Sequence, residues 1–106
     1  MTTFTRGQVY WATFSEELGR KPWLVVSNNT RNRHLNDVLV ARITTTPKPP
    51  ISSIVAIPAG ECVSGSVLCD DIQAMYEDDY PELVGALSPQ VMRAVDRALA
   101  AAFALT

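Results

Sequence analysis

Short runs of apolar, aromatic and β-branched residues fill the first three quarters of the chain and predict strands. Residues 8–14 are rich in aromatic and β-branched side chains and follow the turn-former Gly7, a pattern typical of a strand. Residues 22–27 form an almost continuous apolar run without alternation, which predicts a central strand buried on both faces. Pro22 is expected at its first residue, where a missing N–H costs least.

Further strands are expected downstream. In residues 37–43 the even-numbered positions lie on one face of a strand and the odd-numbered positions on the other. Residues 44–50 contain three prolines in four positions and predict a loop. Two more strands are expected over residues 53–57 and 66–72, with Gly60 and Gly65 on either side of the turn between them.

The C-terminal pattern changes to helical spacing. Ser88 is a suitable N-cap, and Pro89 fits the first helical position. The apolar stripe that follows consists of Val91, Met92, Val95, Leu99, Ala102 and Phe103. The expected fold is mainly β, a strongly bent antiparallel sheet or small barrel with a C-terminal helix. A length of 106 residues without a linker predicts one domain over residues 1–106.

Charge is distributed unevenly along the chain. The net charge is −2, but residues 1–60 carry seven basic against three acidic side chains, and residues 61–106 carry two against eight. The longest apolar run, residues 98–105, is too short to span a membrane, and no export signal opens the chain. Two cysteines and one histidine make neither a zinc set nor a disulfide framework. We therefore expect a reduced, cytoplasmic protein without a metal or cofactor.

Polar residues at strand ends are the candidates for chemistry, and each has an ordinary alternative. His34 is the only imidazole, in a polar segment that reads as an exposed loop. The cations Arg20 and Lys21 immediately precede a strand. They could bind a phosphate group there, or they could be an ordinary pair of solvent-exposed charges in a turn. Three threonines, residues 44–46, follow the next strand. Their hydroxyls could donate hydrogen bonds to phosphate oxygens, or they could form a turn before the proline.

Acidic residues give two further candidates. Asp70 and Asp71 interrupt an apolar strand, so at least one should meet the core or a neighbouring element. The pair is either a structural ion pair or a general acid or base. Residues 77–82 form an acidic stretch that reads as a solvated loop, or as a surface for a basic partner.

The order of these segments resembles the MazF/PemK family of toxin endoribonucleases from bacterial toxin–antitoxin pairs. The resemblance runs from Arg6 to about Leu105 and is carried by RGQVY, RKPWLVVSN, NR, VARITT, VLCD, LSP and VDRAL in that order. It implies a small SH3-like barrel that forms homodimers and binds a cognate antitoxin, which carries an acidic, flexible tail. It also implies metal-independent cleavage of single-stranded RNA by 2′-OH attack, leaving 2′,3′-cyclic phosphate and 5′-OH ends.

The resemblance assigns roles to particular residues. Arg20, Thr44 and Asp70 match the family's catalytic positions, with Asp70 as a candidate base. The residues expected to bind RNA are Glu17, Lys21, Arg31, Arg33, His34, Thr45 and Lys48. The family's arginine directly precedes the proline, where this chain has Lys21, so either Arg20 is shifted into place or Lys21 substitutes for it.

Two alternatives remain at this stage. A CcdB-like toxin shares the barrel but poisons DNA gyrase by binding; its Trp-Gly-Ile tail is absent, because this chain ends in FALT. A catalytically weakened toxin retained for antitoxin binding is suggested by Lys21 and by Leu68, which stands where some members carry an arginine.

Overall fold

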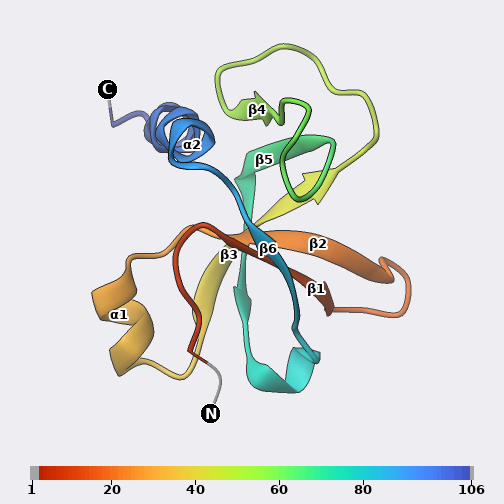
Figure 1. Cartoon of the computed structure of the whole chain (residues 1–106), viewed down its shortest axis with the longest axis vertical. Helices are drawn as coiled ribbons and strands as arrows, with labels where there is room; N and C mark the ends of the chain where they lie inside the picture. The colour runs from red at the N-terminus through yellow and green to blue at the C-terminus, as the bar shows by residue number, and fades with distance from the viewer. Residues whose placement is uncertain (1–2, 106) are drawn as a thin grey trace.

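A computed structural model describes residues 3–105 (Figure 1). Its strands are β1 (Gln8–Thr13), β2 (Arg20–Val25), β3 (Val38–Thr44), β4 (Ile54–Ala56), β5 (Ser66–Met75) and β6 (Glu82–Ala86). Its helices are α1 (Asn29–His34), the 3-10 turn η1 (Glu77–Asp79) and α2 (Pro89–Ala102). The prediction of a mainly β fold with a C-terminal helix is confirmed.

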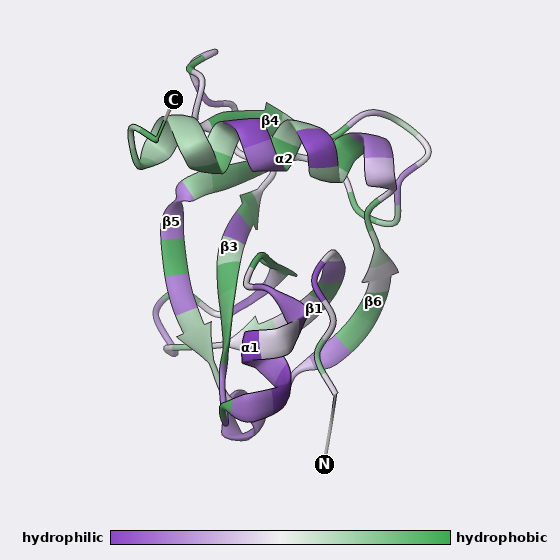
Figure 2. Cartoon of the chain, turned by 90° about the vertical axis from the view of Figure 1, so that its left-hand side faces the viewer, coloured by the Kyte–Doolittle hydropathy of each residue, from purple (hydrophilic) through white to green (hydrophobic). Residues whose placement is uncertain are grey.

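The strands form one antiparallel sheet in the order β4-β5-β3-β2-β1-β6. The sheet curls strongly, so that β5 and β6 lie on opposite sides of the view in Figure 2, with α2 across one end. Ser88 caps α2 as predicted, because its hydroxyl oxygen accepts a hydrogen bond from the Val91 N–H. None of the helices in the described part of the chain is long and apolar enough to cross a membrane.

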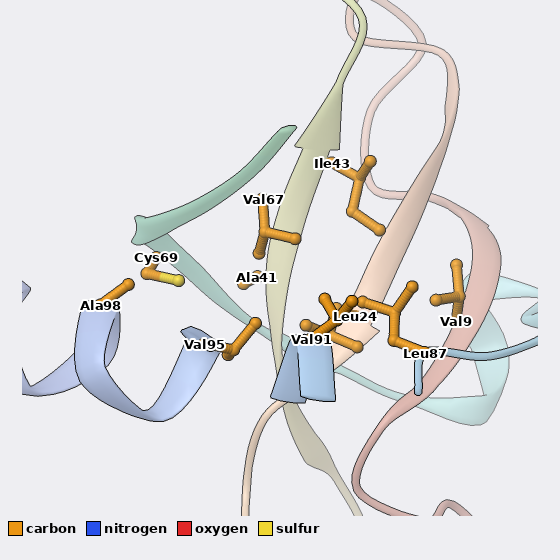
Figure 3. Packing of buried hydrophobic residues seen from close by; sticks show 10 residues of the cluster. All are labelled: Val9, Leu24, Ala41, Ile43, Val67, Cys69, Leu87, Val91, Val95 and Ala98. Atoms are coloured by element: carbon orange, nitrogen blue, oxygen red, sulfur yellow. The ribbon is translucent and has the colours of Figure 1, made fainter. Parts of the chain in front are cut away.

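The core lies on both faces of the central strands. The helix-side core joins the sheet to α2 (Figure 3) and consists of Val9, Leu24, Ala41, Ile43, Val67, Cys69, Leu87, Val91, Val95 and Ala98. The opposite core consists of Phe4, Tyr10, Ala12, Trp23, Val25, Val38, Val40 and Met75. Strands β2 and β3 contribute to both clusters, which confirms that residues 22–27 include a strand buried on two faces.

Several local expectations are wrong. Residues 29–34 form a helix instead of a loop, because the Asn28 side chain accepts a hydrogen bond from the Arg31 N–H and caps it. Strand β2 begins at Arg20, so Pro22 lies inside the strand, opposite Trp11. Phe103 follows the helix as its C-cap and is exposed, so it does not belong to the buried stripe.

The acidic stretch and the strand lengths also differ from the predictions. Residues 77–79 form the η1 turn, and Glu82 begins β6, an edge strand that the sequence analysis missed. Strand β5 continues beyond Ile72 to Met75, and β4 is only three residues long. The extension of β5 lets its second half pair with the start of β3.

Gly65 fixes the end of β3. Its φ is +118°, and a Cβ added there would overlap the carbonyl oxygen of Thr44. Gly60 also has a positive φ, +94°, but a Cβ there would meet nothing within 4 Å.

We therefore expect Gly65→Ala to destabilise the fold more than Gly60→Ala. Gly60→Ala should lose about 1–3 kcal/mol from backbone strain alone, whereas Gly65→Ala adds a steric overlap with backbone. Urea denaturation of the two variants measures the difference. Equal losses of unfolding free energy would contradict the close approach of Gly65 to β3.

Candidate active site

A cavity of about 620 Å³ lies where β2 begins and β3 ends. The segment that joins β4 to β5 contributes much of its lining. The lining residues are Trp11, Arg20, Lys21, Pro22, Arg42, Ile43, Thr44, Thr45, Thr46 and residues 57–64. Cations and hydroxyls from two neighbouring strands therefore meet in one place.

The lining of this cavity is positively charged. Arg20, Lys21 and Arg42 are its basic residues, and Glu61 is the one carboxylate among the lining residues. An oxygen of Glu61 already accepts a hydrogen bond from the Ser88 N–H at 2.9 Å. Such an excess of positive charge favours an anionic ligand.

The strand register decides which cation faces which hydroxyl. Trp23 of β2 lies directly opposite Arg42 of β3. Lys21 stands two residues before Trp23, and Thr44 stands two residues after Arg42. Because side chains alternate along a strand, Lys21, Arg42 and Thr44 share one face of the sheet.

Arg20 lies on the other face, by the same alternation. Its guanidinium donates to the Tyr80 carbonyl at 3.1 Å and to a carboxylate oxygen of Glu82 at 3.2 Å. The Lys21 side chain has no hydrogen bond or ion pair within residues 3–105. Of the two adjacent cations, Lys21 is thus the one that shares a face with Thr44, and Arg20 reaches the cavity from the β6 side.

Thr44 is held closely in place. Thr44 is only 8% exposed, and its hydroxyl oxygen accepts a hydrogen bond from the Thr46 N–H at 3.1 Å. A hydroxyl that already accepts one hydrogen bond still has its own proton to donate. Thr45, which is exposed, lines the same cavity.

The other sequence candidates lie elsewhere. Glu17, Lys48 and Asp70 are exposed and do not belong to the lining of this cavity. Arg33 and His34 line a second cavity, of about 600 Å³, near the start of β3. The seven residues of β3 separate the two cavities by about 20 Å at the usual rise per residue.

Two of the sequence candidates make local bonds. Arg31 donates to the Asp37 carboxylate at 2.8 Å and to its carbonyl at 3.0 Å, which ties α1 to the start of β3. The His34 ring nitrogen Nδ1 lies 2.7 Å from the Thr30 carbonyl oxygen, within the same helix. Both contacts serve the local structure of α1.

The aspartate pair lies at a bulge. Ala41 pairs with Ile72 and Arg42 with Leu68, so residues 69–71 have no partner on β3. Asp70 is exposed there, and an oxygen of Asp71 lies 3.9 Å from the Arg42 guanidinium. The expectation that one aspartate meets a neighbouring element is confirmed for Asp71, at the surface.

Among the cavity residues that the sequence analysis did not propose are Trp11, Arg42 and Glu61. The available signal was the spacing of Arg42, two residues before Thr44 on the same strand. Nothing local to Trp11 or Glu61 indicates this site, because the sheet order brings them there.

Neither cysteine is set up as a nucleophile. Burial, with a smaller contribution from the Asp70 charge, raises the pKa of Cys69 to about 11. Burial also raises the pKa of the Cys62 thiol. Both stay protonated at neutral pH, and residues 3–105 contain no cluster of three side chains suited to a metal ion.

Comparisons with known proteins identify the family of the chain. A family model described as the PemK-like, MazF-like toxin of type II toxin–antitoxin systems matches residues 5–103. Endoribonuclease MazF4 of Mycobacterium tuberculosis is 40% identical over 100 residues, covering 94% of this chain and 92% of the relative.

Solved structures extend the likeness. An endoribonuclease from a mycobacterial species has a TM-score of 0.87 at 38% identity, covering 98% of this chain and 94% of that one. An endoribonuclease in complex with its cognate antitoxin, also mycobacterial, has a TM-score of 0.89 at 38% identity, covering 97% of both chains. The chain therefore belongs to the PemK-like, MazF-like family of toxins from type II toxin–antitoxin systems.

Proposed function

We propose that this MazF-type endoribonuclease cleaves single-stranded RNA at short sequences without a metal. The ribose 2′-oxygen attacks the adjacent phosphorus and the bond to the 5′-oxygen breaks, which leaves a 2′,3′-cyclic phosphate and a 5′-OH. A water molecule takes the proton of the 2′-OH, and Lys21 gives one proton to the 5′-oxygen and regains it from solvent. The observation that carries the proposal is that Lys21 and Thr44 share a sheet face and line one cation-rich cavity.

Each residue has a role that suits its chemistry. Thr44 donates its hydroxyl proton to a non-bridging oxygen of the scissile phosphate. The ammonium of Lys21 stabilises the negative charge that builds up on the phosphorane and supplies the proton of the leaving 5′-oxygen. Arg20, partly neutralised by Glu82, holds a neighbouring phosphate on the β6 side.

The general-base role predicted for Asp70 has no support in this arrangement. Asp70 is exposed on the bulge of β5 and does not line the cavity. Arg33 and His34, which were predicted to bind RNA, also lie outside this cavity, near the other end of β3. An RNA that contacts both cavities must extend along the molecule for about 20 Å.

The family places this chain in a pair with an antitoxin. We propose that the antitoxin covers the cation-rich cavity with an acidic, flexible tail, because carboxylates match its excess of positive charge. We propose further that the toxin acts as a homodimer. In the related complex, the mycobacterial endoribonuclease is bound to its cognate antitoxin.

The direct test is to incubate purified protein with mixed-sequence RNA in the presence of EDTA and to map the new ends. We expect cleavage to continue in EDTA, because no step needs a metal. The cuts should fall at one short recurring sequence and leave 5′-OH ends and 2′,3′-cyclic phosphates. Absence of cleavage, or cleavage that EDTA abolishes, would contradict the proposal. Inhibition of DNA gyrase without RNA cleavage would favour the gyrase-binding alternative.

Variants of the two adjacent cations separate their roles. Lys21→Ala should lower kcat by about 100-fold or more, the usual loss when one donor to a developing oxyanion is removed. Arg20→Ala should lower it by less than about tenfold, because an exposed ion pair already engages this side chain.

Lys21→Arg is the matched variant that keeps the charge. A guanidinium binds phosphate oxygens but does not give up a proton, so we expect kcat to fall, by less than in Lys21→Ala. Single-turnover cleavage of the mapped RNA site measures all three variants. A larger loss for Arg20→Ala than for Lys21→Ala would reverse the assignment.

A further inference from the structure

Arg42 is a cation of the cavity to which neither the family resemblance nor the proposed chemistry gives a role. It stands in β3 two residues before Thr44, so the two side chains emerge on the same face, about 7 Å apart along the strand. It faces Trp23 on one neighbouring strand and Leu68 on the other, both buried.

The guanidinium of Arg42 has donors to spare. Its side chain is 29% exposed, and the buried Nε has no hydrogen-bond partner. Its NH1 lies 3.9 Å from an Asp71 carboxylate oxygen, which is beyond hydrogen-bond distance. A loose, partly exposed ion pair of this kind contributes little to stability. Stability alone therefore does not account for an arginine here.

The bulge of β5 places the opposing charge. Because residues 69–71 have no partner on β3, the backbone of β5 bends where Asp71 approaches Arg42. The carboxylate balances the guanidinium but leaves most of its N–H groups unused.

We propose that Arg42 is a further RNA-binding residue, which holds a phosphate next to the cleaved bond while Asp71 balances its charge in the absence of RNA. The inference rests on the proposed function, because it takes the ligand of the cavity to be RNA. Arg42 is the residue of β3 that carries a positive charge beside Thr44, and a guanidinium binds phosphate through paired hydrogen bonds.

Binding is measured separately from cleavage. The probe is a short 5′-fluorescein-labelled 2′-O-methyl RNA of random sequence, which cannot be cut by 2′-OH attack, and anisotropy gives Kd over a series of salt concentrations. For single strands, the logarithm of the association constant falls linearly with the logarithm of the salt concentration. The steepness of this fall is about 0.7 for each phosphate that the protein neutralises. We expect Arg42→Gln to weaken binding by about tenfold at low salt and to reduce the slope by about 0.7.

Arg42→Lys, which keeps the charge, should retain the slope and lose part of the affinity. Arg93→Gln removes an exposed arginine of α2 outside the cavity and should change neither quantity. An unchanged slope in Arg42→Gln, or an equal change in Arg93→Gln, would overturn the inference. A merely structural role for Arg42 would lower the folded fraction without changing the slope.

Asp71→Asn gives a second test should Arg42→Gln fold poorly. Loss of the opposing carboxylate should tighten binding of the same probe a few-fold, whereas unchanged or weaker binding would overturn the inference. Absence of cleavage by wild type would contradict the proposed function, but the salt slopes would still report whether Arg42 contacts RNA.

Discussion

The burial of β2 and β3 on both faces is the constraint on which the rest of this structure depends. Their side chains alternate between the helix-side core and the opposite core, with Leu24 on one face and Trp23 and Val25 on the other. A register slip of one residue would exchange every one of these positions between faces. The register that packs the two cores therefore also sets which polar side chains emerge together where the strands end.

The cavity is a consequence of that alternation. Burial decreases toward the start of β2, and the face that holds Trp23 inside the sheet presents Lys21, Arg42 and Thr44 where the two strands end. Gly65 allows the backbone of the next strand to approach the Thr44 carbonyl closely. The site thus rests on strand ends fixed by the core, a more rigid support than a free loop.

The strands and the C-terminal helix were predictable because their signals are local. Apolar runs, the Ser88 cap and the glycines beside the β4–β5 turn all act within a few residues. The α1 helix was missed because Asn28 is both a turn-former and a good N-cap, and the outcome depends on which hydrogen bond forms. Strand β6 was missed because pairing with β1, distant in the sequence, decides whether residues 82–86 extend.

The site was predictable only in part, for a related reason. The resemblance pointed to the region of Arg20 and Lys21 but left open which cation faces Thr44, and that depends on strand register. The bulge that separates Asp70 from the cavity and brings Asp71 toward Arg42 arises from pairing between β3 and β5. Trp11 and Glu61 reach the cavity through the sheet order and the β4–β5 connection, which no short motif encodes.

The central claim is that Lys21 and Thr44 act on one phosphate. A double-mutant cycle with Lys21→Ala and Thr44→Val, followed by single-turnover cleavage of RNA, tests it most directly. Residues that act as a unit are strongly non-additive, so the double variant should be about as slow as the slower single variant. Losses that multiply, as for independent sites, would contradict the account.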